Sequence, residues 1–148
     1  MRQGEKYDRK KAVSYAREWA LGRNPAFGNF SGLGGDCANF ASQCLWAGWN
    51  RHMAAEWYYH SMSDRTPSWS GVRFLRGWLL EAGRAEVCDL AEAEAGDMIF
   101  LWNGQRYYHT LVVLSPGGDP LVAAHTHDVL NRPLSDYGPV AREALHVL

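Results

Sequence analysis

The chain has 148 residues, of which 47% are hydrophobic and 21% are charged, and its formal net charge is −1. This length predicts one domain, residues 1–148, with enough apolar side chains for a core. The dispersed, nearly balanced charge argues against nucleic acid or an anionic membrane as a partner. The sequence has no apolar run of membrane length, and its first residues lack the apolar region of a signal peptide. We therefore expect a cytoplasmic protein, or an exported one whose leader has been removed.

Helical spacing of apolar residues predicts three helices in the first half of the chain. The first covers residues 7–21 and ends at Gly22, because Asn24-Pro25 prevents its continuation. The second begins at Cys37 and closes at Gly48. The third has an apolar stripe over residues 72–79 and stops at Gly83. The aromatic-rich stretch 49–69 shows little periodicity and is expected to be ordered but irregular, with core packing as the default role of its aromatic rings.

From residue 94 onward the apolar pattern alternates, which is typical of strands. Strands are expected at residues 98–102, 107–114, 121–127 and 144–148. Asn103-Gly104 is a strong hairpin signal. Helices followed by a meander of strands predict an α+β fold in which the N-terminal helices pack on an antiparallel sheet.

Cys37 follows two glycines and Asp36 at the start of the second predicted helix. Asp36 is a candidate N-cap whose carboxylate accepts from the first turn. A thiol at this position lies in the positive end of the helix dipole, which favours the nucleophilic thiolate. The alternative is that Cys37 is a small hydrophobe packed at a helix start.

The cysteine count favours a free thiol. Three cysteines are an odd number, so at least one lacks an intramolecular partner. Cys37 and Cys44 are seven residues apart on one predicted helix, about 10 Å along its axis, which is too far for a disulfide. Any bridge within the chain would have to involve Cys88.

Three histidines lie at the ends of two predicted strands. His109 begins one strand, and His125 and His127 end the next. Opposite residues of an antiparallel pair depend on where the turn is centred. A turn centred on Gly117 places His109 opposite His125, and a turn centred on Gly118 places it opposite His127. Since His125 and His127 are two apart on a strand, both are expected on the face of His109.

Three hypotheses follow for these histidines. In the first, His109 takes the proton of Cys37, and His125, His127 or Asp128 orients the imidazole. In the second, His109, His125 and His127 bind zinc, with Asp128 or Cys37 as a further ligand. In the third, they are polar residues at strand ends and have no catalytic function.

The sequence resembles the putative amidase domain family, which is related to the papain-like, NlpC-type cysteine peptidases. The matching segments occur in order along nearly the whole chain: Tyr7-Asp8-Arg9, Arg23-Asn24-Pro25, Gly35-Asp36-Cys37-Ala38-Asn39-Phe40, Trp57-Tyr58-Tyr59, Gly96-Asp97, His109 and Ala124-His125-Thr126. The resemblance implies a papain-like core, with Cys37 as nucleophile, His109 as general base and acid, and His125 as the third polar residue.

We therefore predict a cysteine amidohydrolase or peptidase that cleaves an amide bond through a thioester, without a cofactor or metal ion. The expected substrate is a small peptide or amide, and peptidoglycan peptides are suggested only by the family resemblance. A zinc hydrolase that uses His109, His125 and His127 is one alternative. An inactive binding module of the same fold is the other. The sequence makes no prediction of oligomeric state.

Overall fold

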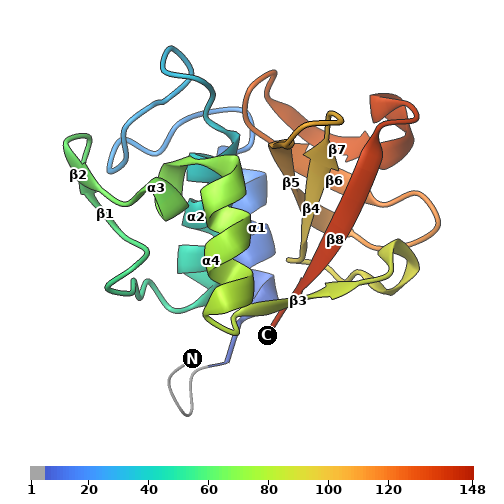
Figure 1. Ribbon diagram of the computed structural model, residues 1–148, viewed down its shortest axis with the longest axis horizontal. Coiled ribbons are helices and arrows are strands. Elements are labelled where there is room, and N and C mark those ends of the chain that lie inside the picture. The colour runs from blue at the N-terminus through green and yellow to red at the C-terminus, as the bar shows by residue number, and fades with distance from the viewer. Residues whose placement is uncertain (1–5) are drawn as a thin grey trace.

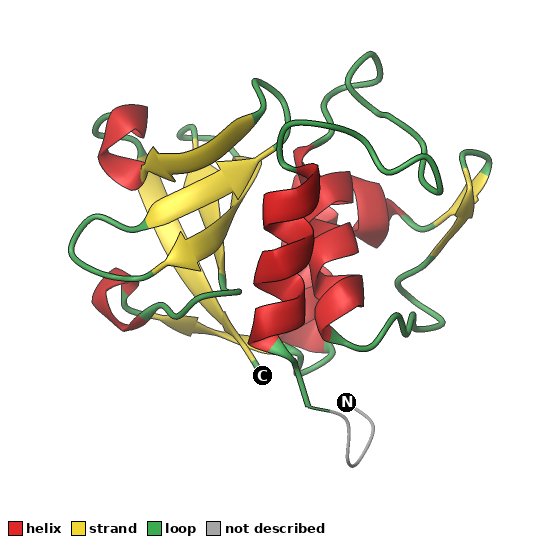
Figure 2. Ribbon diagram, turned by 180° about the vertical axis from the view of Figure 1, so that it is seen from behind, coloured by secondary structure: helices red, strands yellow, loops and turns green. Residues whose placement is uncertain are grey.

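The structure is a computed structural model that describes residues 6–148. It places a group of helices against a curved, six-stranded antiparallel sheet (Figure 1). Figure 2 shows the same two layers from behind. The predicted α+β class and the packing of N-terminal helices on an antiparallel sheet are confirmed. Within residues 6–148, no helix is long and apolar enough to cross a membrane.

The helical layer is built around α2 (Cys37–Gly48), with ten of its twelve residues buried. It packs against α1 (Arg9–Trp19), the short α3 (Pro67–Ser70), α4 (Val72–Glu81) and the central strand β5 (Tyr107–Ser115). The predicted bounds of α2 are confirmed. The helix α1 is shorter than predicted at both ends: it begins at Arg9 because Asp8 caps it by accepting from Lys11 N, and it ends at Trp19.

Most of the remaining elements are strands. They are β1 (Tyr59–Ser61), β2 (Asp64–Arg65), β3 (Ala85–Cys88), β4 (Met98–Trp102), β5 (Tyr107–Ser115), β6 (Leu121–Ala124), β7 (Val129–Pro133) and β8 (Ala141–Val147). Two short 3₁₀ helices, η1 (Leu90–Glu92) and η2 (Leu134–Tyr137), complete the chain.

The large sheet has the order β3-β8-β4-β5-β6-β7. The predicted strands at 98–102 and 107–114 and the hairpin between them are confirmed. The prediction of one strand over 121–127 is wrong beyond Ala124, because Thr126 and His127 adopt positive φ angles of 63° and 58° in a turn. Local sequence pattern does not predict β3 and β7, nor does it predict that β8 lies between β3 and β4.

Two cores lie on the two faces of this sheet. The helix-facing core contains Phe100 and Val112 together with buried tryptophans, and the Trp57 and Trp78 rings stack at 4.9 Å. The core on the opposite face contains Leu101 and other strand residues whose side chains point away from the helices. This two-residue alternation decides which face each strand residue presents to the candidate site.

Candidate active site

Cys37 and His109 line one cavity of about 660 Å³ at the N-terminal end of α2. Cys37 occupies the first turn of α2 and is 5% exposed. His109 lies on β5 opposite Leu101 of β4, so its side chain lies on the sheet face away from the helices. The other lining residues are Gly34, Gly35, Leu101, Tyr108, Thr126, His127, Arg132 and Tyr137.

The setting of Cys37 does not produce a resting thiolate. Burial raises the pKa of the Cys37 thiol to about 11, although backbone N–H groups of Thr110, Ala38 and Cys37 itself act in the opposite direction. Asp36 raises it further. The predicted stabilisation of the thiolate by the helix start is therefore wrong as a net effect, because the loss of hydration outweighs it.

His109 is a neutral base in the same cavity. Burial lowers the pKa of His109 to about 4, with smaller contributions from His127 and Arg132. Within residues 6–148, neither ring nitrogen of His109 forms a hydrogen bond. A thiol and a neutral imidazole thus share the cavity, an arrangement suited to proton transfer during nucleophilic attack rather than before it.

His125 contacts Asp36 rather than His109. Its Nδ1 lies 2.5 Å from Asp36 Oδ2, its Nε2 lies 2.8 Å from the carbonyl oxygen of Trp19, and its ring stacks on Phe40. Both ring nitrogens of His125 are therefore engaged within the protein, which fixes the orientation of the ring.

The expectation that His125 or His127 lies opposite His109 on a shared strand face is therefore wrong. Val112 pairs with Ala123, a register midway between the two that we considered, and β6 ends before His125. His127 reaches the cavity from the turn that follows β6. The backbone reversal in this turn breaks the alternation on which the prediction depended.

Asp36 anchors the start of α2 instead of capping it. Its side chain accepts no capping hydrogen bond from a backbone N–H of the first turn. It accepts from Phe30 N at 2.8 Å and from Asn39 Nδ2 at 2.9 Å, and it pairs with His125. Burial raises the pKa of Asp36, but the hydrogen bonds from His125, Asn39 and Phe30 together lower it below its usual value.

Arg23 and Thr126 extend this anchor, and neither residue was predicted to have a role in the site. Arg23 Nε lies 3.2 Å from Asp36 Oδ2, and Arg23 also binds Asp128. Thr126 Oγ1 accepts from Asp36 N at 3.0 Å. The turn at residues 125–128 therefore holds the loop that presents Cys37. The polar residues next to His125 in the sequence were the signal from which a role for this turn could have been predicted.

The proposed zinc ligands do not converge. Both nitrogens of His125 are engaged by Asp36 and Trp19, whereas His109 and His127 line the cavity. Among residues 6–148, no group of three or more His, Cys, Asp and Glu side chains is placed to hold a metal ion. The zinc alternative therefore lacks the ligand set on which it was based.

Comparison with known proteins gives a family for this arrangement. The family described as "Putative amidase domain" matches residues 6–147. This chain belongs to the putative amidase domain family. The family description indicates hydrolysis of an amide bond.

An uncharacterized protein, YhbB, of Bacillus subtilis (strain 168) is 35% identical over 138 residues. The match covers 82% of this amidase-family chain and 42% of YhbB, so the chain spans less than half the length of that relative. No solved structure matches the chain.

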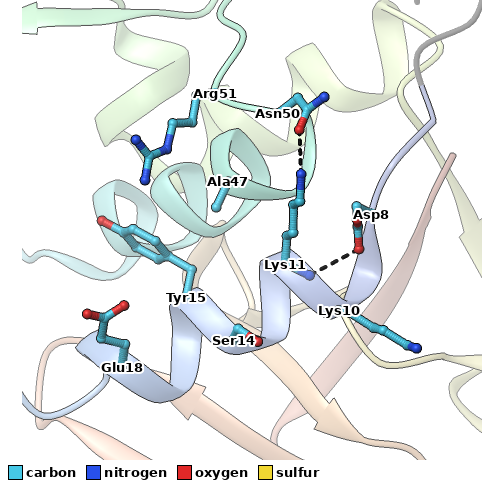
Figure 3. Close-up of a pocket in the computed structure, with 9 residues that line it drawn as sticks. All are labelled: Asp8, Lys10, Lys11, Ser14, Tyr15, Glu18, Ala47, Asn50 and Arg51. Atoms are coloured by element: carbon cyan, nitrogen blue, oxygen red, sulfur yellow. Dashed lines mark hydrogen bonds between the residues drawn. The ribbon is translucent and has the colours of Figure 1, made fainter.

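A second cavity, of about 550 Å³, lies at the other end of α2 in this amidase-family domain (Figure 3). It is lined by Asp8, Lys10, Lys11, Ser14, Tyr15, Glu18, Ala47, Asn50 and Arg51. Lys11 Nζ donates to Asn50 Oδ1 at 2.7 Å. Because this lining has neither cysteine nor histidine, the cavity with Cys37 and His109 is the candidate active site.

Proposed function

We propose that this domain is a cysteine amidohydrolase that works through a thioester acyl-enzyme. The observation that carries the proposal is the shared cavity, in which a thiol on the first turn of α2 faces the same space as a neutral imidazole on β5. Family membership supplies the reaction class, and these two side chains supply a nucleophile and a base for it.

The chemistry begins when Cys37 Sγ attacks the amide carbonyl carbon while His109 accepts the thiol proton. The tetrahedral oxyanion receives a hydrogen bond from the backbone N–H of Cys37 at the helix start. When the C–N bond breaks, protonated His109 gives its proton to the leaving amine. Water then attacks the thioester with His109 as base, which releases the carboxylic acid and restores the thiol.

A helix-borne cysteine facing a strand-borne histidine supports the further proposal of a papain-like, NlpC-type core. Because NlpC-type enzymes are peptidases, this proposed core favours peptide amides as substrates, including peptidoglycan-type peptides. His125, the third residue of the expected trio, is proposed as a positioning residue, because its contact with Asp36 holds the Cys37 turn.

The test compares Cys37→Ala, His109→Gln and the control Cys88→Ala on a panel of peptide amides. Cys88 is an unpaired thiol outside the cavity. We expect Cys37→Ala to abolish turnover and His109→Gln to lower kcat by about 10²-fold or more. We expect Cys88→Ala to match the parent protein. Mass spectrometry of the quenched reaction is expected to show an acyl group on Cys37.

Two outcomes would contradict the mechanism. Turnover that survives in Cys37→Ala but stops with a chelator would indicate a metal hydrolase. Absence of turnover in the parent protein, together with substrate binding that Cys37→Ala leaves unchanged, would indicate a binding module.

A further inference from the structure

The lining of the cavity around Cys37 and His109 carries a positive charge and no negative charge. Its ten lining residues include Arg132 and two histidines but neither aspartate nor glutamate. The buried carboxylate of Asp36, which directly precedes Cys37, is already paired with His125 and Arg23. The lining therefore offers a positive charge to a ligand and no carboxylate to repel an anion.

A β-bulge places Arg132 in this cavity. On β7, Val129 pairs with Ala124 and Arg132 pairs with Val122, so one extra residue lies between these two pairs. Within this bulge, Asn131 has a positive φ of 58° and so departs from regular strand geometry. Without the extra residue, Asn131 rather than Arg132 would share the face of Val122 and Val129. That face is the one on which His109 lies.

Arg132 is held in place without being neutralised. Its guanidinium lies over the Tyr137 ring, 4.4 Å from the ring centroid, and Tyr137 itself lines the cavity. Its ion pair with Asp136 is long, at 3.8 Å, and half of the Asp136 side chain is exposed. A long pair in contact with water screens the guanidinium only weakly, so the charge remains available to a ligand.

We propose that Arg132 is a specificity-determining residue that binds a carboxylate of the substrate beside the scissile amide. The inference rests on the proposed function of Cys37 and His109, and it narrows the substrate class to amides that carry a free carboxylate near the bond that is cut. A planar guanidinium matches a carboxylate in shape and charge, and the Tyr137 ring fixes its orientation.

The first test needs no turnover, because it uses Cys37 as a reporter. The Cys37 thiol is alkylated at about pH 9 with iodoacetate, which is anionic, and with iodoacetamide, which is neutral and of similar size. The ratio of the two rates is measured by mass spectrometry, with Cys88 as an internal reference in the same sample. Cys88 lies near Asp97, Glu92 and Asp89 and therefore disfavours the anionic reagent.

We expect Arg132→Gln to lower the iodoacetate-to-iodoacetamide ratio at Cys37 by about three- to tenfold, since one nearby positive charge is lost. Arg132→Lys keeps the charge and should keep most of the ratio. Arg73→Gln removes the same charge from an exposed position on α4 and should leave the ratio unchanged. An equal ratio in the parent protein and a folded Arg132→Gln would overturn the proposal.

The second test uses matched peptide amides with Glu or Gln next to the scissile bond. We expect the parent protein to prefer the Glu peptide in kcat/KM, and Arg132→Gln to lose that preference while it still cleaves the Gln peptide. Equal cleavage of both peptides by the parent protein overturns the inference and leaves the proposed function intact. If Cys37→Ala still turns over substrate, the proposed function fails, and the alkylation ratio alone decides whether Arg132 binds the anion.

Discussion

At the start of α2, burial and the helix dipole act on the Cys37 thiol in opposite directions. Three backbone N–H groups face the sulfur, yet the pKa of Cys37 is raised to about 11 because burial dominates. The helix dipole typically stabilises a charged group by less than about 1 kcal/mol. Burial can shift the pKa of a group by several units, so the effect of burial is the larger of the two. Position at a helix start therefore does not by itself make a cysteine reactive.

Alkylation of Cys37 should consequently depend on alkaline pH. A raised pKa moves the thiolate fraction to higher pH, so we expect the iodoacetamide rate at Cys37 to keep rising above pH 9 and to be slow at pH 7. The measurement is the alkylation rate against pH by mass spectrometry. A rate that reaches its plateau below pH 8 would show that the thiolate is the resting form.

Two carboxylates bind Arg23 in very different surroundings, which makes them a matched pair for substitution. Asp36 is fully buried, whereas the Asp128 side chain is 29% exposed. We expect Asp36→Asn to lower the free energy of unfolding by about 3 kcal/mol, because it replaces the buried carboxylate that binds His125, Asn39 and Phe30. We expect Asp128→Asn to cost less than about 1 kcal/mol. Urea unfolding at pH 7 measures both.

The effect of Asp36 should also depend on pH. Because the pKa of Asp36 is lower in the folded protein than its ordinary value of 3.8, its contribution is complete above that value. It is lost as pH falls through the folded-state pKa. The stability difference between the parent protein and Asp36→Asn should thus be constant from pH 8 to 5 and shrink below about pH 4. A difference that grows in acid would contradict this assignment.

At the scale of elements, the close contact of α1 and α2 depends on the last residue of α2. Gly48 lies against Ala12 of α1 and against Tyr7, which precedes α1. Tyr7 is fixed in place, because its hydroxyl donates to Gly96 O at 2.7 Å and its ring packs on Trp49. The absence of a side chain at Gly48 allows this approach.

Two glycines in helices should therefore respond oppositely to alanine. A Cβ at Gly48 would overlap the Tyr7 ring and lie 3.1 Å from Ala12 Cβ. We expect Gly48→Ala to destabilise the fold by about 1–3 kcal/mol. Gly77 lies inside α4, where an alanine methyl would meet no neighbouring side chain or other element within 4 Å, and we expect Gly77→Ala to stabilise by about 0.5–1 kcal/mol. Thermal unfolding distinguishes them, and equal signs would contradict the packing argument.

At the scale of the whole molecule, β8 completes the sheet. It pairs with β3 along one edge and with β4 along the other, and Leu145 contributes to the helix-facing core. The sheet can therefore form only when β8 pairs with β3 and β4, which lie far from it in the sequence. Such long-range pairing makes folding depend on the last strand.

Removal of residues 141–148 should abolish cooperative unfolding. The truncation exposes the edges of β3 and β4 and opens both cores, since Ala144 and Leu145 are buried on opposite faces. Removal of Leu148 alone, a residue that is 39% exposed, is the control and should leave a cooperative transition. Circular dichroism during thermal unfolding measures both. A cooperative transition in the long truncation would show that β8 is dispensable.

The elements that the sequence predicts correctly are those specified by local pattern. Helical spacing gives α2 from Cys37 to Gly48, and Asn103-Gly104 gives the β4–β5 hairpin. The apolar alternation gives β4 and β5 nearly to their ends. Their signals lie within a few residues, so a single sequence carries them. The position of β8 depends on pairing between strands that lie far apart in the chain, and no local pattern carries that information.

The sequence by itself determined the family, through Gly35-Asp36-Cys37-Ala38-Asn39-Phe40 and the segments around it, and it identified Cys37 and His109 as the candidate pair. Only the tertiary structure decided the surroundings of that pair. It turned His125 toward Asp36, buried the thiol and brought Arg132 to the cavity. The physical reason is that a positive φ at Thr126 and a bulge at Asn131 reverse which face a side chain occupies, while burial depends on contacts from distant elements.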